Sequence, residues 1–144
     1  MAFSLHPQLD KDTSYLGDFP LCRVLLHKDA TVPWVILVPR FDNLTELHHL
    51  PMPKQQQYLV ESQLVCEAIE ALFTPDKLNT GALGNMVPQL HLHHIARYKH
   101  DAVWPKPVWG NTSGEFRDEK SQLDMVSLIQ NYLSKSDIFS TASE

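Results

Sequence analysis

The segment QLHLHHIAR, residues 89–97, holds three of the chain's eight histidines within four positions. In an extended strand, successive side chains point to opposite faces. Leu90 and Leu92 then share a face that is expected to contact the core. The positions that share the other, open face are Gln89, His91, His93 and Ile95. The segment predicts a half-buried strand that presents an amide and two imidazoles at steps of about 7 Å.

Composition limits the classes of protein to consider. The chain has 144 residues, of which 43% are hydrophobic and 20% are charged, as in ordinary single-domain globular proteins. Its formal net charge is −5, and its 12 basic residues are scattered. A nucleic-acid polymer is therefore not an expected partner, because such binding usually needs a continuous basic surface. A small anion held by local donors remains compatible with this charge.

We expect a soluble, cytoplasmic protein. The first twelve residues lack the basic start and apolar run of a secretory signal, and no apolar run approaches the ~20 residues of a membrane span. Cys22 and Cys66 are isolated in the sequence. They are interpreted as reduced thiols rather than as part of a disulfide framework or zinc site.

Apolar runs predict the strands of a sheet. Residues 21–27 and 34–39 form two such runs, and the short polar segment between them suits a hairpin connection. Residues 34–38 are apolar at every position, which is typical of a central strand buried on both faces. Residues 77–83 predict a further strand, antiparallel to the histidine segment.

Two segments show helical periodicity, with apolar residues repeating every three or four positions in 54–73 and along one side of 119–133. A helix crossing between two antiparallel strand pairs predicts an α+β fold, in which helices pack on one face of an antiparallel sheet.

The chain is expected to form one compact unit. Residues 1–118 are predicted to form the domain, and residues 119–144 a helix and tail that pack on it or extend it. Residues 1–20 are interpreted as a lead-in segment or a short helix, and residues 134–144 as a frayed tail.

Three explanations compete for His91 and His93. The first is that two surface histidines fall on a solvated face by chance. The second is a metal site, which needs a third ligand; the candidates are His27, His94, His100 and Asp101. The third is chemistry on a phosphate, because neutral imidazole is abundant near pH 7 and can attack phosphorus or exchange protons.

The residues resemble a known family. The stretch LGNMVPQLHLHHIAR, residues 83–97, resembles the signature of the histidine-triad (HIT) proteins, in which His-φ-His-φ-His-φ-φ follows a Gly-polar-x-Val loop. The matching positions are Gly84, Asn85, Val87, Gln89, His91, His93 and Arg97. Residues 21–40 resemble the family's strand–turn–strand, which ends in a Pro-basic pair, here Pro39–Arg40. The resemblance spans residues 20–100.

This resemblance implies a nucleotide hydrolase or nucleotidyl transferase, such as a dinucleoside-polyphosphate hydrolase or a nucleoside phosphoramidase. It also implies an antiparallel α+β fold, a homodimer in which two sheets extend one another, and no cofactor or resident metal. His91 would be the nucleophile at the α-phosphate and would carry a nucleotidyl intermediate. His93 would donate to the phosphate or the leaving group, and Asn85 would contact phosphate.

Three further residues are expected near the substrate, two of them with looser alignment and one at the end of the matched motif. Asn79 and His27 fall where the family contacts nucleotide and ribose. Arg97 could bind phosphate through two N–H groups or lie at a solvated strand end.

The sequence departs from the family pattern at two positions. Gln89 stands in place of the first triad histidine, and Trp34 stands where some relatives have a further histidine. An amide can donate a hydrogen bond but cannot carry a charge, although the backbone carbonyl of Gln89 can still orient His91. Nucleotide binding is therefore a firmer expectation than fast turnover. The alternatives are a nucleotide sensor or adaptor and a metal enzyme using His91 and His93.

Three aromatic residues have less defined roles. His94 lies on the leucine side of the predicted strand and is expected to be packed or hydrogen-bonded. Trp104 and Trp109 could close over the site, but packing at the edge of the core is the preferred interpretation.

Overall fold

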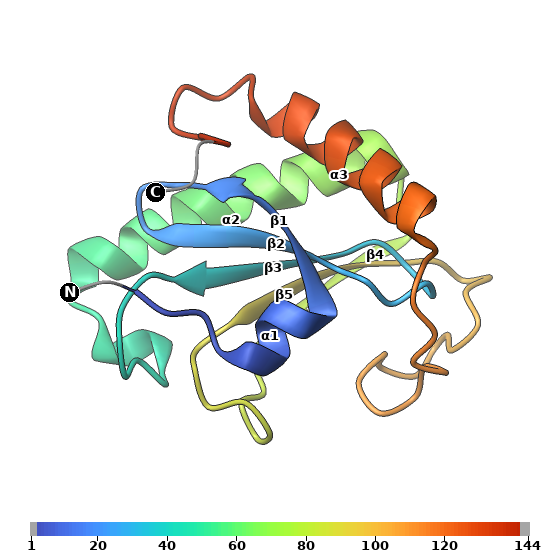
Figure 1. The fold of residues 1–144 in the computed structure, drawn as a ribbon, viewed down its shortest axis with the longest axis horizontal. Helices are drawn as coiled ribbons and strands as arrows, with labels where there is room; N and C mark the ends of the chain where they lie inside the picture. Colours follow the sequence, from blue (N-terminus) through green and yellow to red (C-terminus); the bar gives the residue numbers. More distant parts are fainter. Residues whose placement is uncertain (1–2, 142–144) are drawn as a thin grey trace.

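The computed structural model describes residues 3–141, and its centre is one five-stranded sheet (Figure 1). The strands are β1 (Thr13–Asp18), β2 (Cys22–His27), β3 (Trp34–Pro39), β4 (Lys77–Gly81) and β5 (Leu92–Arg97). They are antiparallel throughout and lie in the order β1-β2-β3-β5-β4. The predicted α+β class with an antiparallel sheet is confirmed.

The central strand is β3, as its sequence predicts. β2 and β3 form the expected hairpin, and β3 pairs on its other side with β5, where Trp34 lies opposite Ile95. Every residue of β3 is buried. A strand with neighbours on both edges and cover on both faces accommodates apolar side chains at every position.

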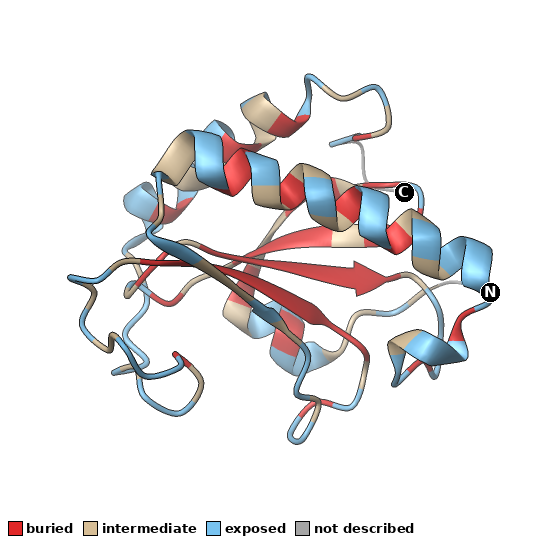
Figure 2. Cartoon of the chain, turned by 180° about the vertical axis from the view of Figure 1, so that it is seen from behind, coloured by how far each residue is buried: buried red, intermediate tan, exposed pale blue. Residues whose placement is uncertain are grey.

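Two long helices cover one face of the sheet (Figure 2). They are α2 (Met52–Phe73) and α3 (Glu119–Leu133). Val65 and Ile69 of α2 and Ile129 of α3 belong to the same core cluster. Asp118 caps α3 by accepting a hydrogen bond from the backbone N–H of Ser121 at 2.7 Å. None of the helices in residues 3–141 has both the length and the apolarity needed to span a bilayer.

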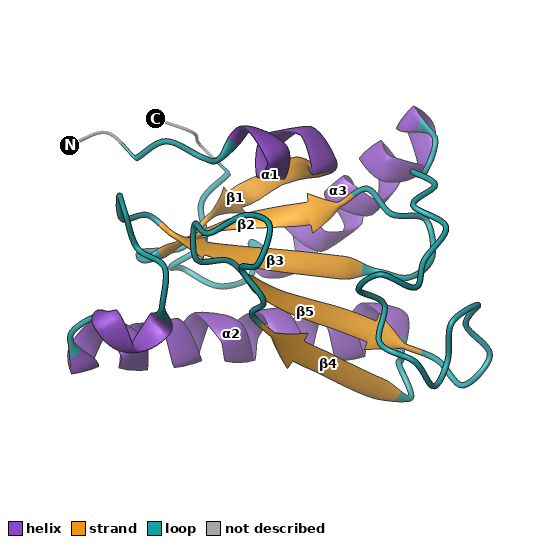
Figure 3. Cartoon of the chain, turned by 90° about the horizontal axis from the view of Figure 1, so that it is seen from below, coloured by secondary structure: helices purple, strands orange, loops and turns teal. Residues whose placement is uncertain are grey.

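The other face of the sheet is also covered. The short helix α1 (Pro7–Asp12) lies on this face at its β1 edge, and loops cover the rest (Figure 3). Beneath them is a second apolar cluster, formed by Leu9, Leu25, Val32, Trp34, Ile36, Val38, Val87, Ile95 and Val108. The prediction of an open face is therefore wrong: side chains on this face lie in a pocket.

Residues 1–20 contain a strand that the sequence analysis did not predict. The short helix α1 was anticipated, but the edge strand β1 follows it directly. The register of β1 shifts between Tyr15 and Gly17, which breaks the alternation that identifies a strand. Residues 1 and 2 lie outside the described residues.

The tail after α3 is packed on the domain rather than frayed. The Phe139 ring meets the Phe19 ring edge-on, with centroids 5.2 Å apart. Ser140 and Asp18 exchange two backbone hydrogen bonds, at 2.7 and 2.9 Å. Gly17 permits this approach, because a Cβ there would overlap the Phe139 ring. Residues 142–144, also predicted to be frayed, lie outside the described residues.

Candidate active site

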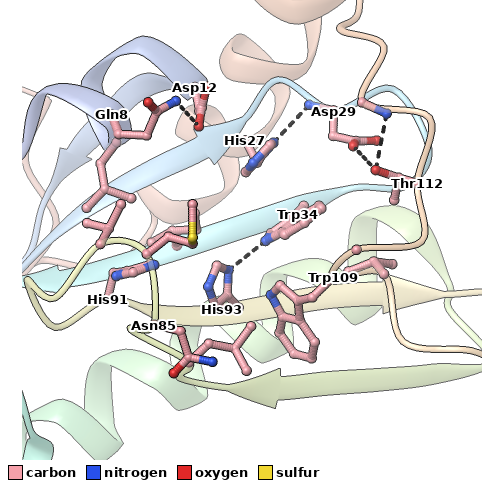
Figure 4. A pocket seen from close by; sticks show the side chains of 18 of the residues that line it. Gln8, Asp12, His27, Asp29, Trp34, Asn85, His91, His93, Trp109 and Thr112 are labelled. Atoms are coloured by element: carbon pink, nitrogen blue, oxygen red, sulfur yellow. Dashed lines mark hydrogen bonds between the residues drawn. The ribbon is translucent and has the colours of Figure 1, made fainter.

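A pocket of about 480 Å³ lies on the α1 side of the sheet (Figure 4). The strands contribute His27, Trp34 and His93 to its lining. Its walls come from α1, from the loop before β5, and from residues 108–116. The volume falls within the roughly 300–1,000 Å³ typical of small-molecule sites.

The pocket gathers some of the predicted site residues and excludes others. Those that line it are His27, Asn85, His91 and His93. Those that do not line it are Gln89, Asn79 and Arg97.

His91 lies directly before β5 and is held by the backbone. Its Nδ1 is 2.7 Å from the carbonyl oxygen of Gln89. A carbonyl oxygen only accepts, so Nδ1 carries the proton. Burial lowers the pKa of His91 below the ordinary histidine value, which keeps the ring neutral near pH 7. Its other nitrogen, Nε2, therefore has a free lone pair, and the ring lines the pocket (Figure 4).

His93 stands beside His91, with ring centroids 4.9 Å apart and planes at 70°. The indole Nε1 of Trp34 donates a hydrogen bond to its Nδ1 at 2.9 Å. Burial, reinforced by His91 and His27, lowers the pKa of His93 to about 3. The pocket thus presents two neutral imidazoles next to one another.

His27 extends this aromatic surface along β2. Its ring stacks on Trp34, with centroids 4.1 Å apart and planes at 16°. The backbone N–H of Asp29 donates to His27 Nδ1 at 3.0 Å. Burial lowers the pKa of His27, an effect that Asp12 and Asp29 oppose.

Asp29 and Thr112 are pocket residues that the sequence analysis did not select. The Thr112 hydroxyl donates to the Asp29 carboxylate at 2.7 Å, which ties the wall at residues 108–116 to the end of β2. The local signal is an Asx turn, in which the Asp29 carboxylate accepts from the Thr31 N–H. Such turns occur in many loops, so the pattern does not single out a site.

The two tryptophans after β5 have different places. Trp104 lies outside the pocket, with its ring 5.6 Å from the Arg97 guanidinium carbon. Trp109 lines the pocket and meets the His93 ring edge-on, with centroids 5.3 Å apart. Its indole nitrogen is buried and has no hydrogen-bond partner among residues 3–141. Trp109 therefore belongs to the site and not merely to the edge of the core.

The side chain of Gln89 does not line the pocket, where its backbone carbonyl holds His91; the side chain binds the residues that precede α1. Its side-chain oxygen accepts from the His6 N–H, and its side-chain nitrogen donates to the Ser4 carbonyl, both at 2.9 Å. The predicted row of one amide and two imidazoles is therefore wrong. Strand β5 begins at Leu92, so the alternation does not extend back to Gln89.

Arg97 and Asn79 bind one another away from the pocket. Arg97 is 1% exposed. Its Nη1 donates to Asn79 at 2.9 Å, and its Nε donates to Asp101 at 3.0 Å. The ion pair, with backbone N–H donors, lowers the pKa of Asp101 to about 2 against the opposing effect of burial. Arg97 is thus a buried structural cation and does not lie at a solvated strand end.

His94 occupies the core side of β5, as expected. It is fully buried, and its two ring nitrogens lie 2.8 Å from the Ser62 hydroxyl and 3.0 Å from the Leu92 carbonyl. Burial lowers the pKa of His94 to about 4. It is a neutral, hydrogen-bonded core residue.

The sequence of this domain matches a known family. The HIT domain is recognised over residues 8–100. The chain belongs to the HIT-domain family. A histidine triad protein from Marinobacter aquaeolei VT8 is 47% identical to this HIT-family chain, with a TM-score of 0.89 over 94% of this chain and 98% of that one. A histidine triad protein from Bradyrhizobium japonicum is 42% identical, with a TM-score of 0.89 over 92% of this chain and 99% of that one.

A curated relative carries the name of an activity. The bis(5'-adenosyl)-triphosphatase of Saccharomyces cerevisiae is 29% identical to this HIT-family chain over 99 residues, or 62% of the chain. The match covers 48% of the yeast protein, so the chain spans about half the length of the curated relatives it matches.

Proposed function

We propose that this HIT-family chain hydrolyses or transfers the nucleotidyl group of a nucleoside polyphosphate or phosphoramidate, through an intermediate on His91. The observation that carries the proposal is the 2.7 Å hydrogen bond from His91 Nδ1 to the Gln89 carbonyl, which frees Nε2 as a nucleophile. Family membership and the name of the yeast relative support a dinucleoside polyphosphate as one substrate.

The proposed reaction has two displacements. His91 Nε2 attacks the α-phosphorus, and the bond to the leaving group breaks with its electron pair. The imidazole then carries a positive charge, which the Gln89 carbonyl at Nδ1 stabilises without any proton transfer. In the second step water attacks the phosphorus, the P–N bond breaks with its electron pair returning to Nε2, and a proton of the attacking water is released to solvent.

Three other pocket residues complete the proposed site. His93 lies beside the nucleophile and donates to the phosphate or the leaving group. Asn85, on the loop before β5, supplies an amide to the phosphate, and His27 contacts the nucleoside. We further propose that Gln89 occupies the first triad position and orients His91 through its backbone alone. Asn79 and Arg97 stay outside this proposal because they are bonded to one another.

The proposal is tested by trapping the intermediate. Purified protein is mixed with diadenosine triphosphate or an adenosine phosphoramidate and quenched without acid, and its intact mass is measured. We expect a mass gain of one nucleotidyl group, which is absent in His91→Ala. The matched control is His48→Ala, an exposed histidine outside the pocket, which should form the adduct as the wild type does.

Other outcomes separate the alternatives. Saturable nucleotide binding with neither adduct nor product would favour a sensor or adaptor. Full turnover in His91→Ala would contradict the assigned nucleophile. If the protein neither binds nor turns over nucleotide, the proposed function is wrong and the metal alternative is favoured.

The metal alternative finds little support in the arrangement of side chains. Among residues 3–141, no three His, Cys, Asp or Glu side chains are grouped so that they could hold a metal ion. Asp101, one of the suggested third ligands, is bonded to Arg97 instead.

We also propose a homodimer, as the family resemblance implies. Strand β4 lies at the edge of the sheet and pairs only with β5 among the described strands. A partner's β4 could therefore extend the sheet. Light scattering coupled to size-exclusion chromatography should give twice the mass of the chain; a monomer at micromolar concentration would contradict this.

A further inference from the structure

The hydrogen bond between Trp34 and His93 determines which nitrogen of His93 carries the proton. An indole nitrogen can only donate a hydrogen bond. At 2.9 Å from Trp34 Nε1, the Nδ1 of His93 must therefore accept and carry no proton. In a neutral imidazole the proton then resides on Nε2, which lies on the side of the ring toward His91 (Figure 4).

The indole is held so that it cannot turn away. Trp34 is 5% exposed and lies on the central strand, opposite Ile95. One face of its ring is stacked on His27, whose Nδ1 is bound by the backbone of Asp29. Trp109 packs edge-on against His93 from the other wall of the pocket. Both partners of the hydrogen bond are thus confined by neighbours.

A second proton on His93 would be opposed by this arrangement. It would place an N–H on Nδ1 against the indole N–H, so that two donors would face each other: the indole would lose its acceptor and the new N–H would have none. The titratable groups that line the pocket around it are His27, His91, Asp12 and Asp29. The Asp29 carboxylate is already bound by Thr112, and no carboxylate is hydrogen-bonded to His93 among the described residues.

We propose that Trp34 is a positioning residue that holds His93 as a neutral imidazole with its proton on Nε2. His93 then donates a hydrogen bond but does not act as an acid. A neutral imidazole that gave up this proton would become an imidazolate, which is far too basic to form near neutral pH.

A substrate preference follows, and it rests on the proposed function. When His91 Nε2 bonds to the α-phosphorus of a phosphoanhydride, the P–O bond breaks and its electron pair stays on the departing phosphate. That oxygen leaves as an anion, because the second pKa of a terminal phosphate is about 6, and it accepts the hydrogen bond from His93 Nε2. The nitrogen of a phosphoramidate must instead gain a proton as its P–N bond breaks. The site should therefore prefer phosphoanhydrides.

The tautomer is tested by NMR on protein labelled with ¹⁵N at histidine. The His93 signals are assigned by their loss in His93→Gln. We expect an unprotonated Nδ1, a protonated Nε2, and no titration of His93 down to the lowest pH at which the protein stays folded. In Trp34→Phe, which keeps a ring but has no N–H, both tautomers should appear and titration should move to higher pH. Trp104→Phe removes an indole outside the pocket and should leave the His93 signals unchanged. A protonated Nδ1 in the wild type would overturn the proposal even if Trp34→Phe failed to fold.

The preference is tested by comparing kcat/KM for diadenosine triphosphate and an adenosine phosphoramidate. General acid catalysis contributes about 10²–10⁴-fold, so we expect a preference for the anhydride on the order of 10². Trp34→His should reduce this preference, because an imidazole at position 34 can accept a hydrogen bond from the Nδ1–H of a protonated His93. Equal rates in the wild type would overturn the preference. If neither substrate is turned over, the proposed function is contradicted. The proposed tautomer of His93 is not, because the NMR measurement does not depend on activity.

Discussion

The side-chain oxygen of Gln89 accepts a hydrogen bond from the backbone N–H of His6, at 2.9 Å and 83 positions away in the chain. The same amide donates to the Ser4 carbonyl. Helix α1 begins directly after His6, and its residues Gln8 and Asp12 line the pocket. The amide thus fastens one wall of the pocket to the loop that carries the nucleophile.

Gln89→Ala should remove the two side-chain hydrogen bonds while keeping the backbone carbonyl that holds His91. Two hydrogen bonds are lost, each contributing about 0.5–1.5 kcal/mol, so we expect the free energy of unfolding to fall by about 1–3 kcal/mol. KM should rise several-fold as α1 loosens, whereas kcat should change less because residue 89 keeps its carbonyl. Urea unfolding and steady-state kinetics measure the two effects. Gln63→Ala, an exposed glutamine on α2, is the control; a fall in kcat with unchanged KM would contradict the assigned role.

Removing the partner of the buried Arg97 should destabilise the fold. Asp101→Asn leaves a guanidinium of 1% exposure without its counter-charge, and we expect a loss of about 3–5 kcal/mol. The matched control is Asp124→Asn on α3, where the ion pair with Lys120 is exposed, and about 0–1 kcal/mol should be lost. Denaturant titration compares the two variants. Similar small losses in both would show that Arg97 does not depend on Asp101.

Stability should fall as the solution is acidified below the ordinary histidine pKa. His93 and His94 bind a proton at a pKa of about 6.5 when the chain is unfolded, but only at about 3 and about 4 when it is folded. Between these values the unfolded state binds more protons, so acid favours unfolding. The contribution is fully present above pH ~6.5 and is lost toward the folded pKa values.

For the fully buried His94, this difference corresponds to about 3 kcal/mol. Unfolding free energies measured from neutral pH down to the acid limit of folding should show the decline, and His94→Gln should show a smaller one. A flat profile in the wild type would refute the low pKa values.

Chelation should leave the protein unchanged. Because no metal-holding group of side chains occurs among residues 3–141, we expect dialysis against EDTA to alter neither turnover nor the unfolding midpoint. Activity that is lost on dialysis and restored by zinc would favour the metal alternative.

Much of the fold follows from local sequence patterns. The helix over 119–133 was predicted with the bounds of α3, and the helix over 54–73 differs from α2 by two residues at its start. The strand predicted over 34–39 is β3. These elements have strong periodicity or unbroken apolar runs. Strand β1 has neither, because its register shift and Gly17 interrupt the alternation.

The sequence by itself determined the order of the main strands and helices, and it brought His91 and His93 to one side of the histidine segment. Both results depend on the spacing of neighbouring residues, which the backbone geometry of a strand or helix translates directly into faces. The same reasoning failed for Gln89, which precedes β5, and for Arg97, whose partners Asn79 and Asp101 lie outside β5.

The sequence allowed the nearby carbonyl of Gln89 to orient His91, but only the tertiary structure decided which nitrogen His93 offers to the pocket. For His93 that choice depends on the indole of Trp34, 59 positions away, and the pocket wall depends on Asp29 and Thr112, 83 positions apart. A hydrogen bond fixes a tautomer only when donor and acceptor meet at about 3 Å. No local pattern in the sequence encodes that meeting; packing of the whole sheet and its loops does.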